Sequence, residues 1–242
     1  MPHLFVNRPR IHDLTSGSTE FRTPFRWETI NAVLYKIGGL VFIIGSVLFF
    51  PRFEAYADLG AWTFFLGSLI YLVVTGHDFA EVIHIRRTGQ HRDAFEALEH
   101  IAASAYLLGT ILFTVGSVFF LSTVGFFIAG AWCFVIGSLL FVLGACINVV
   151  QVQHGDTLLA RKLMNYTAIC FVVGSVLFVV ASVPYLWHFK AESDRTITYA
   201  FLAWQYLIGS ALFLLGGVFN YWRAYDFIQR QIKLSPRGAG RL

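Results

Sequence analysis

Six long stretches of this 242-residue chain are almost free of charged side chains, and each is long enough to cross a membrane as a helix. They cover residues 33–50, 59–77, 101–121, 125–150, 165–186 and 199–222. Only 13% of all residues are charged, whereas soluble domains carry about 25%. Backbone polar groups in lipid must be paired within their own segment, which requires helices here. The sequence therefore predicts an all-α, polytopic membrane protein with six transmembrane helices.

Basic residues are distributed unevenly over the segments that join the apolar runs. Fifteen of the 18 Lys and Arg residues lie on the side that holds both termini, and three, Arg52, Lys190 and Arg195, lie on the other. Positive charge is retained on the cytoplasmic side of membrane proteins. We therefore expect a multi-pass protein of the cell membrane with both termini in the cytoplasm. The basic residues occupy short segments between apolar runs, which argues against a nucleic-acid partner.

A short pattern recurs in three successive pairs of runs. Every run contains a Gly-Ser pair: Gly45-Ser46, Gly67-Ser68, Gly116-Ser117, Gly137-Ser138, Gly174-Ser175 and Gly209-Ser210. A tryptophan stands five residues before the second pair of each unit, at Trp62, Trp132 and Trp204. Asp78, Asn148 and Asn220 stand eleven residues after the glycine of that pair. A tyrosine is expected to open each unit, at Tyr35, Tyr106 and Tyr166. The fold is thus predicted to be three parallel two-helix repeats.

This repeat divides the chain into seven predicted parts. A cytoplasmic segment, 1–32, contains a possible interfacial amphipathic anchor and precedes the first repeat, 33–78. A charged cytoplasmic connection, 79–100, leads to the second repeat, 101–150, and a cytoplasmic loop, 151–164, leads to the third, 165–222. The third repeat is expected to carry a longer external loop, 183–198, and a basic cytoplasmic tail, 223–242, follows it.

The repeated residues have an interpretation in helix packing. Small residues recur at intervals of seven, as in Gly38 and Gly45 or Gly109 and Gly116, and so form one narrow stripe on each helix. Such stripes let helices approach closely in lipid. The three tryptophans are expected to form an aromatic belt at the membrane surface. We expect Asp78 and its two asparagine counterparts to hydrogen-bond at the inner ends of the second helices.

The Gly-Ser hairpin with a tryptophan before its second Gly-Ser pair resembles the YrhK-like membrane domain. The resemblance covers residues 35–78 and 106–148 most clearly, and 166–220 with the loop insertion. It implies a helical hairpin in the membrane, and it brings no catalytic residue with it.

The connection between the second and third runs is the richest in polar side chains, and two interpretations of it remain open. Imidazoles and carboxylates at helical spacing could bind a metal where two helix faces meet. The candidate ligands are His77, Glu81, His84, Glu96, Glu99 and His100. The alternative is a solvated helical hairpin with ordinary charge pairs. A haem between His77 and His100 is a further alternative, and on balance no cofactor is expected.

Three functions are compatible with these features. A non-enzymatic helix-packing module, such as a scaffold, accessory or assembly subunit, is favoured because nothing ionisable is expected at mid-membrane and no enzyme motif is present. Its partners would be lipid, further copies of the chain or other membrane proteins. A channel or transporter for a small solute or ion would instead line an axis with the repeated serines. A metal- or haem-binding redox protein would use the polar connection.

Overall fold

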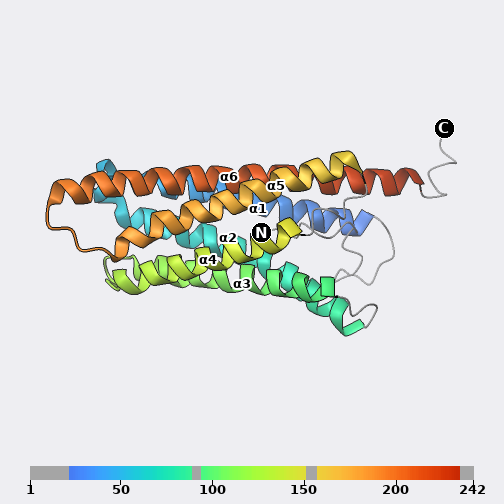
Figure 1. Cartoon of the computed structure of the whole chain (residues 1–242), viewed down its shortest axis with the longest axis horizontal. Coiled ribbons are helices and arrows are strands. Elements are labelled where there is room, and N and C mark those ends of the chain that lie inside the picture. The colour runs from blue at the N-terminus through green and yellow to red at the C-terminus, as the bar shows by residue number, and fades with distance from the viewer. Residues whose placement is uncertain (1–21, 89–93, 151–156, 235–242) are drawn as a thin grey trace.

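The computed structural model of the chain describes residues 22–88, 94–150 and 157–234, and these residues are almost wholly helical (Figure 1). The long helices are α1 (Arg22–Leu48), α2 (Ala57–Thr88), α3 (Ala94–Phe119), α4 (Phe127–Val150), α5 (Leu158–Ser182) and α6 (Glu192–Leu234). Two short 3-10 helices, η1 (Pro51–Tyr56) and η3 (Val183–Leu186), follow α1 and α5. Within the described residues, six helices are long and apolar enough to cross a membrane. The predicted all-α membrane fold is confirmed.

The six helices form a closed ring. Each helix packs against its neighbours in sequence, and α1 also packs against α6. The closing contact is specific: Ser46 Oγ of α1 lies 3.3 Å from Ser210 Oγ of α6, and Lys36 Nζ lies 4.3 Å from the centre of the Tyr221 ring. Three hairpins in series, α1–α2, α3–α4 and α5–α6, therefore enclose one common interior.

The helices run along the long axis of the molecule, so the bundle has two distinct ends (Figure 1). We call the end with η1, the α3–α4 connection and η3 the hairpin end; it lies at the left of Figure 1. The opposite end, where α1 begins and α6 finishes, is the terminal end. Within the hairpin-end turns, Gly125 adopts a φ of 68°, a left-handed conformation that glycine accepts without steric cost.

The helices extend further into the polar segments than the apolar runs indicate. Helix α6 begins at Glu192, so the predicted external loop 183–198 is reduced to η3 and a short stretch after it. The acidic residues Glu192 and Asp194 in the first turn of α6 favour helix there. At the terminal end, α2 continues to Thr88 and α6 to Leu234, because charged side chains are good helix formers once the helix leaves the bilayer. The rest of the predicted tail, 235–242, and residues 1–21 of the predicted N-terminal segment lie outside the described part of the chain.

Aromatic side chains fill the interior of the ring. At its centre three residues at equivalent positions of the repeat meet: Phe64 of α2, Phe134 of α4 and Tyr206 of α6. Their ring centres are 5.7 to 6.4 Å apart. Since α2, α4 and α6 are not neighbours in the ring, this triad lies across its middle. We call these three residues the central plug.

Candidate functional site

A cavity of about 350 Å³ opens at the hairpin end, directly above the central plug. We call it the aromatic cavity, because eight of its fourteen lining residues are Phe or Tyr. All three hairpins contribute to it: its lining comes from the end of α1 and the residues just after it, the start of α2, the residue after α3, the first half of α4 and of α6, and both 3-10 helices.

The walls and the floor of the aromatic cavity form one continuous aromatic surface. Phe134 and Tyr206 of the central plug are its floor. Above them, the Phe120 ring lies 5.0 Å from Phe134 and 5.4 Å from Tyr185 of η3. On the opposite side Phe49 lies 6.0 Å from Tyr206. A molecule in this cavity would contact the faces and edges of aromatic rings on most sides.

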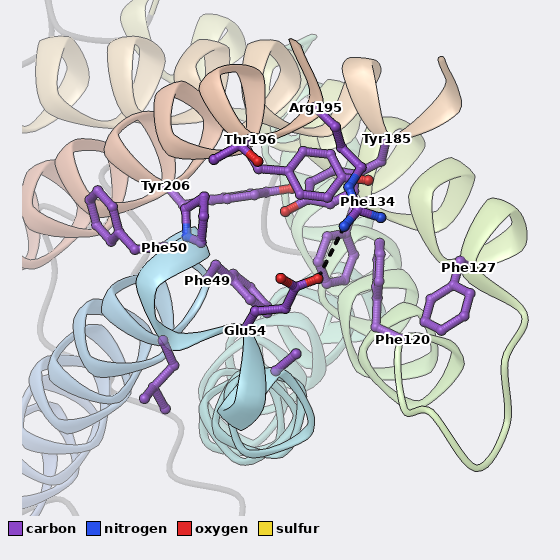
Figure 2. Close-up of a pocket in the computed structure, with 14 residues that line it drawn as sticks. Phe49, Phe50, Glu54, Phe120, Phe127, Phe134, Tyr185, Arg195, Thr196 and Tyr206 are labelled. Carbon is purple, nitrogen blue, oxygen red and sulfur yellow. Dashed lines mark hydrogen bonds and ion pairs between the residues drawn. The ribbon is translucent and has the colours of Figure 1, made fainter. Parts of the chain in front are cut away.

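The rim of the aromatic cavity carries charge. Figure 2 shows Glu54 of η1 and Arg195 of α6 reaching towards each other, with the aromatic side chains around them; their atoms Oε1 and Nη2 are 3.2 Å apart. The same Nη2 atom lies 2.6 Å from Glu192 Oε1. Both glutamate side chains are more than 70% exposed. Two carboxylates thus share one guanidinium, which leaves this trio with a net charge of about −1 at neutral pH.

A second polar feature, at the terminal end, is buried inside the ring. The three repeat-equivalent residues Asp78, Asn148 and Asn220 are each at most 2% exposed. Asn148 Nδ2 donates to the Tyr106 hydroxyl at 2.6 Å, and Arg223 Nη2 donates to Asn220 Oδ1 at 3.1 Å. The Asn148 amide thus ties α4 to a ring of α3, and the Asn220 amide holds the Arg223 guanidinium one turn further along α6.

Three ionisable residues next to this polar layer are also buried, which the sequence interpretation missed. Glu81, Glu99 and Arg223 are 4 to 6% exposed, so a fully solvated helical hairpin is the wrong description of Glu81 and Glu99. The signal was present in the spacing: Glu81 follows Asp78 by three residues, as Arg223 follows Asn220, which puts each pair on one helix face.

The candidate metal ligands do not form a ligand set among the described residues. No group of three His, Cys, Asp or Glu side chains there is arranged to hold a metal ion. His77 Nδ1 lies 3.0 Å from Asn31 Nδ2, and the His100 ring stacks on Phe79 with centres 5.7 Å apart. The side chain of Glu96 lies outside the described part of the structure.

The repeated residues segregate into inward and outward faces. All six Gly-Ser pairs are buried in the ring. The three tryptophans are about half exposed and point away from it, at 49 to 53%. Tyr166 was wrongly assigned to the repeat: it is 48% exposed, whereas Tyr35 and Tyr106 are buried. Counted from the Gly-Ser pair, the equivalent residue of the third hairpin is Met164, which is buried.

Glycines of the ring lie directly against buried rings of the facing helix. A Cβ atom placed on Gly217 of α6 would lie 2.4 Å from ring atoms of Tyr35 of α1, and one on Gly38 of α1 would lie 2.5 Å from the Tyr71 ring of α2. Tyr35 and Tyr71 stack on each other at 4.7 Å. By contrast, a Cβ on Gly76 would meet nothing within 4 Å.

Comparison with protein families gives one match. The family described as YrhK-like protein matches residues 25–83 and residues 96–153. These two segments correspond to the α1–α2 and α3–α4 hairpins, so one family pattern occurs twice in succession. Comparisons with curated proteins and with solved structures give no match.

Proposed function

We propose that the chain, whose first two hairpins match the YrhK-like family, is a non-enzymatic membrane module, a scaffold or accessory subunit that acts by binding. The single observation that carries this proposal is the filled interior of the ring. The described residues arrange six helices around packed aromatic side chains, and such an interior supports a role in binding over the passage of solutes.

The central plug is the main support. Phe64, Phe134 and Tyr206 contact one another across the ring, and the Phe113 and Phe178 rings lie 4.7 Å from Phe134 and 5.1 Å from Tyr206. Opening a path through this layer would require several buried rings to leave close-packed positions. The geometry therefore favours a plugged bundle over the alternative of a channel.

Two of the repeated serines are bonded within their own helices. The Ser46 and Ser117 hydroxyls donate at 2.7 Å to carbonyl oxygens one turn earlier. Ser46 also faces Ser210, across the contact that closes the ring, and a polar contact of this kind can stabilise a helix pair in lipid. Hydroxyls already bonded to their own helix offer little to a passing ion.

The surfaces left for partners are the two ends and the lipid-facing exterior. Except for Gly76, the glycines of the spanning helices are buried within the ring, so a partner would not bind through the glycine stripes. We place the terminal end in the cytoplasm, because fifteen of the 18 basic residues lie on that side of the spans. The hairpin end then faces outwards.

One purification tests this proposal. The chain is extracted in mild detergent and analysed by native mass spectrometry, and in parallel it is reconstituted into liposomes for ion- and solute-flux assays. We expect a stable complex with itself or another membrane protein, and flux no greater than that of empty liposomes. A partner-free monomer would contradict the scaffold role, and specific flux would restore the channel alternative. An optical spectrum with a haem band would favour the redox alternative instead.

A further inference from the structure

We propose that the aromatic cavity is a binding site for a small organic cation that carries apolar or aromatic groups, such as an aryl quaternary ammonium ion. This inference concerns a site and a ligand class, and it holds whether or not the chain also binds a protein partner. It rests on three properties of the cavity: its size, its aromatic surface and the charge on its rim.

The size suits a small molecule. Ligand sites in proteins are concave, mostly apolar and about 300–1,000 Å³ in volume, and the cavity of about 350 Å³ lies at the lower end of that range. Its floor is formed by two residues of the central plug, whose rings also pack against other buried rings. The floor is thus closely packed, and the cavity opens at the hairpin end.

The aromatic surface favours positive charge. The faces of Phe and Tyr rings carry negative partial charge, and cations within about 6 Å of a ring centre are attracted to it. Phe49 presents such a ring on one side of the space, and Phe120 and Phe134, whose ring centres are 5.0 Å apart, present theirs on the other. Three converging rings form a cage in which a quaternary ammonium ion gains contacts without giving up strong hydrogen bonds to water.

The charges on the rim also favour a cationic ligand. Among the described residues, Arg195 is the only basic one that lines the cavity, and its Nη2 atom is paired with both Glu54 and Glu192. An anionic ligand would therefore approach a guanidinium whose charge two carboxylates already offset. A cationic ligand would instead meet the partly unneutralised carboxylate of Glu54. The cavity therefore combines a cation-attracting cage with a rim of net negative charge.

The test compares two ligands that share one shape but differ in charge. Benzyltrimethylammonium and benzylsulfonate each join a phenyl ring to a tetrahedral head group, positive in one and negative in the other. Each is titrated by ligand-observed NMR against the full chain in nanodiscs, with empty nanodiscs as background. We expect saturable binding of the cation and at least tenfold weaker binding of the sulfonate. Equal binding, tighter binding of the sulfonate, or no saturable binding of the cation would overturn the proposal.

Variants at the rim locate the site. Glu54→Gln removes the carboxylate beside the cavity, and we expect about fivefold weaker binding of the cation. Asp194→Asn removes the same charge from an exposed rim position that does not line the cavity, and it should leave the affinity unchanged. Arg195→Gln should tighten cation binding, because two carboxylates then lack their partner. If Glu54→Gln and Asp194→Asn weaken binding equally, the effect is one of general surface charge and the assignment to the cavity is wrong.

A further variant distinguishes attraction of the cation to an aromatic ring from simple apolar contact. Phe127 lines the mouth of the cavity and is half exposed, so Phe127→Leu keeps an apolar surface and puts little of the fold at risk. Loss of its π-face should weaken cation binding about threefold and leave the weak sulfonate binding unchanged. An equal effect on both ligands would show that the ring acts through contact area alone, which would contradict a cation cage.

Discussion

The contact between Gly217 and Tyr35 offers a sharp test of how the ring closes. Gly217→Ala adds one methyl group at the α6–α1 interface, 2.4 Å from two ring atoms of Tyr35, which is well inside normal contact distance. The ring cannot easily retreat, because it stacks on Tyr71. Tyr71 cannot move away in turn, because its own ring packs directly against Gly38 of α1. Relief therefore requires movement of helices rather than of one side chain.

The expected cost follows from two opposing terms. Overpacking of a close-packed core lowers the free energy of unfolding by about 1–3 kcal/mol. Replacing glycine by alanine within a helix raises it by about 1 kcal/mol. Gly76→Ala is the matched control on α2, since a Cβ there meets no atom within 4 Å and only the favourable term applies. The two variants should differ by the overpacking term. At about 2–4 °C per kcal/mol for a chain of this size, their thermal midpoints should differ by about 2–12 °C.

The assay is thermal unfolding of both variants in the same detergent, followed by the fraction that remains monodisperse. A second substitution that compensates for the first makes this test of the interface more specific. The positions equivalent to Gly217 and Tyr35 in the α4–α5 pair hold Ala145 and Met164. Gly217→Ala combined with Tyr35→Met should therefore recover stability lost by Gly217→Ala alone. If Gly217→Ala is as stable as Gly76→Ala, or if the double variant is simply the sum of both losses, the reasoning about this interface fails.

Three further substitutions test individual contacts by their unfolding midpoints. Gly125→Ala should destabilise by about 1–2 kcal/mol, because its left-handed φ of 68° disfavours a Cβ, and Gly125→Asn should be milder; equal effects would contradict this. Tyr106→Phe removes the buried bond from Asn148, and a double-mutant cycle should give a coupling of about 0.6–1.7 kcal/mol, as for hydrogen bonds in membrane bundles; zero coupling would show that the bond contributes nothing. Asp58→Ala should lower the midpoint, because the Asp58 carboxylate accepts the Ser122 backbone N–H at 2.8 Å and so ties α2 to the α3–α4 turn; an unchanged midpoint would rule out that tie.

The helices and the repeat could be predicted because both leave a strong local pattern. Apolar runs of membrane length allow only helices in lipid, and the Gly-Ser pairs fix the equivalence of the hairpins. Errors arose where a single residue type was matched without its spacing. Tyr166 stands eight residues before its Gly-Ser pair, whereas Tyr35 and Tyr106 stand ten before theirs. Its exposure in the structure follows from that shift of two residues around the helix.

The aromatic cavity could not be predicted in the same way, and of the buried charges only the helix face shared with Asp78 or Asn220 could. The cavity joins residues as far apart as Glu54 and Arg195, and their meeting depends on the contact of α1 with α6. Glu81 and Glu99 lie in a segment whose composition is typical of a solvated surface. They are buried because α2 and α3 continue as packed helices beyond their apolar runs. Local sequence carries no information on which distant helix covers such a face.

The central claim is that three hairpins close into one ring through α1 and α6. Cysteine cross-linking measures this directly, in a chain whose native cysteines, Cys133, Cys146 and Cys170, are replaced by alanine. The pair Ser46→Cys and Ser210→Cys places two sulfur atoms where hydroxyl oxygens now lie 3.3 Å apart, within reach of a disulfide. The control pairs Ser46→Cys with Ser138→Cys, the equivalent serine of α4, which is not a ring neighbour of α1. A protease site inserted after residue 90, between α2 and α3, then separates residue 46 from residues 138 and 210 on cleavage. The closed ring predicts that mild oxidation keeps the two fragments covalently joined for the first pair and not for the control; fragments that separate for the first pair, or stay joined equally for both, would contradict it.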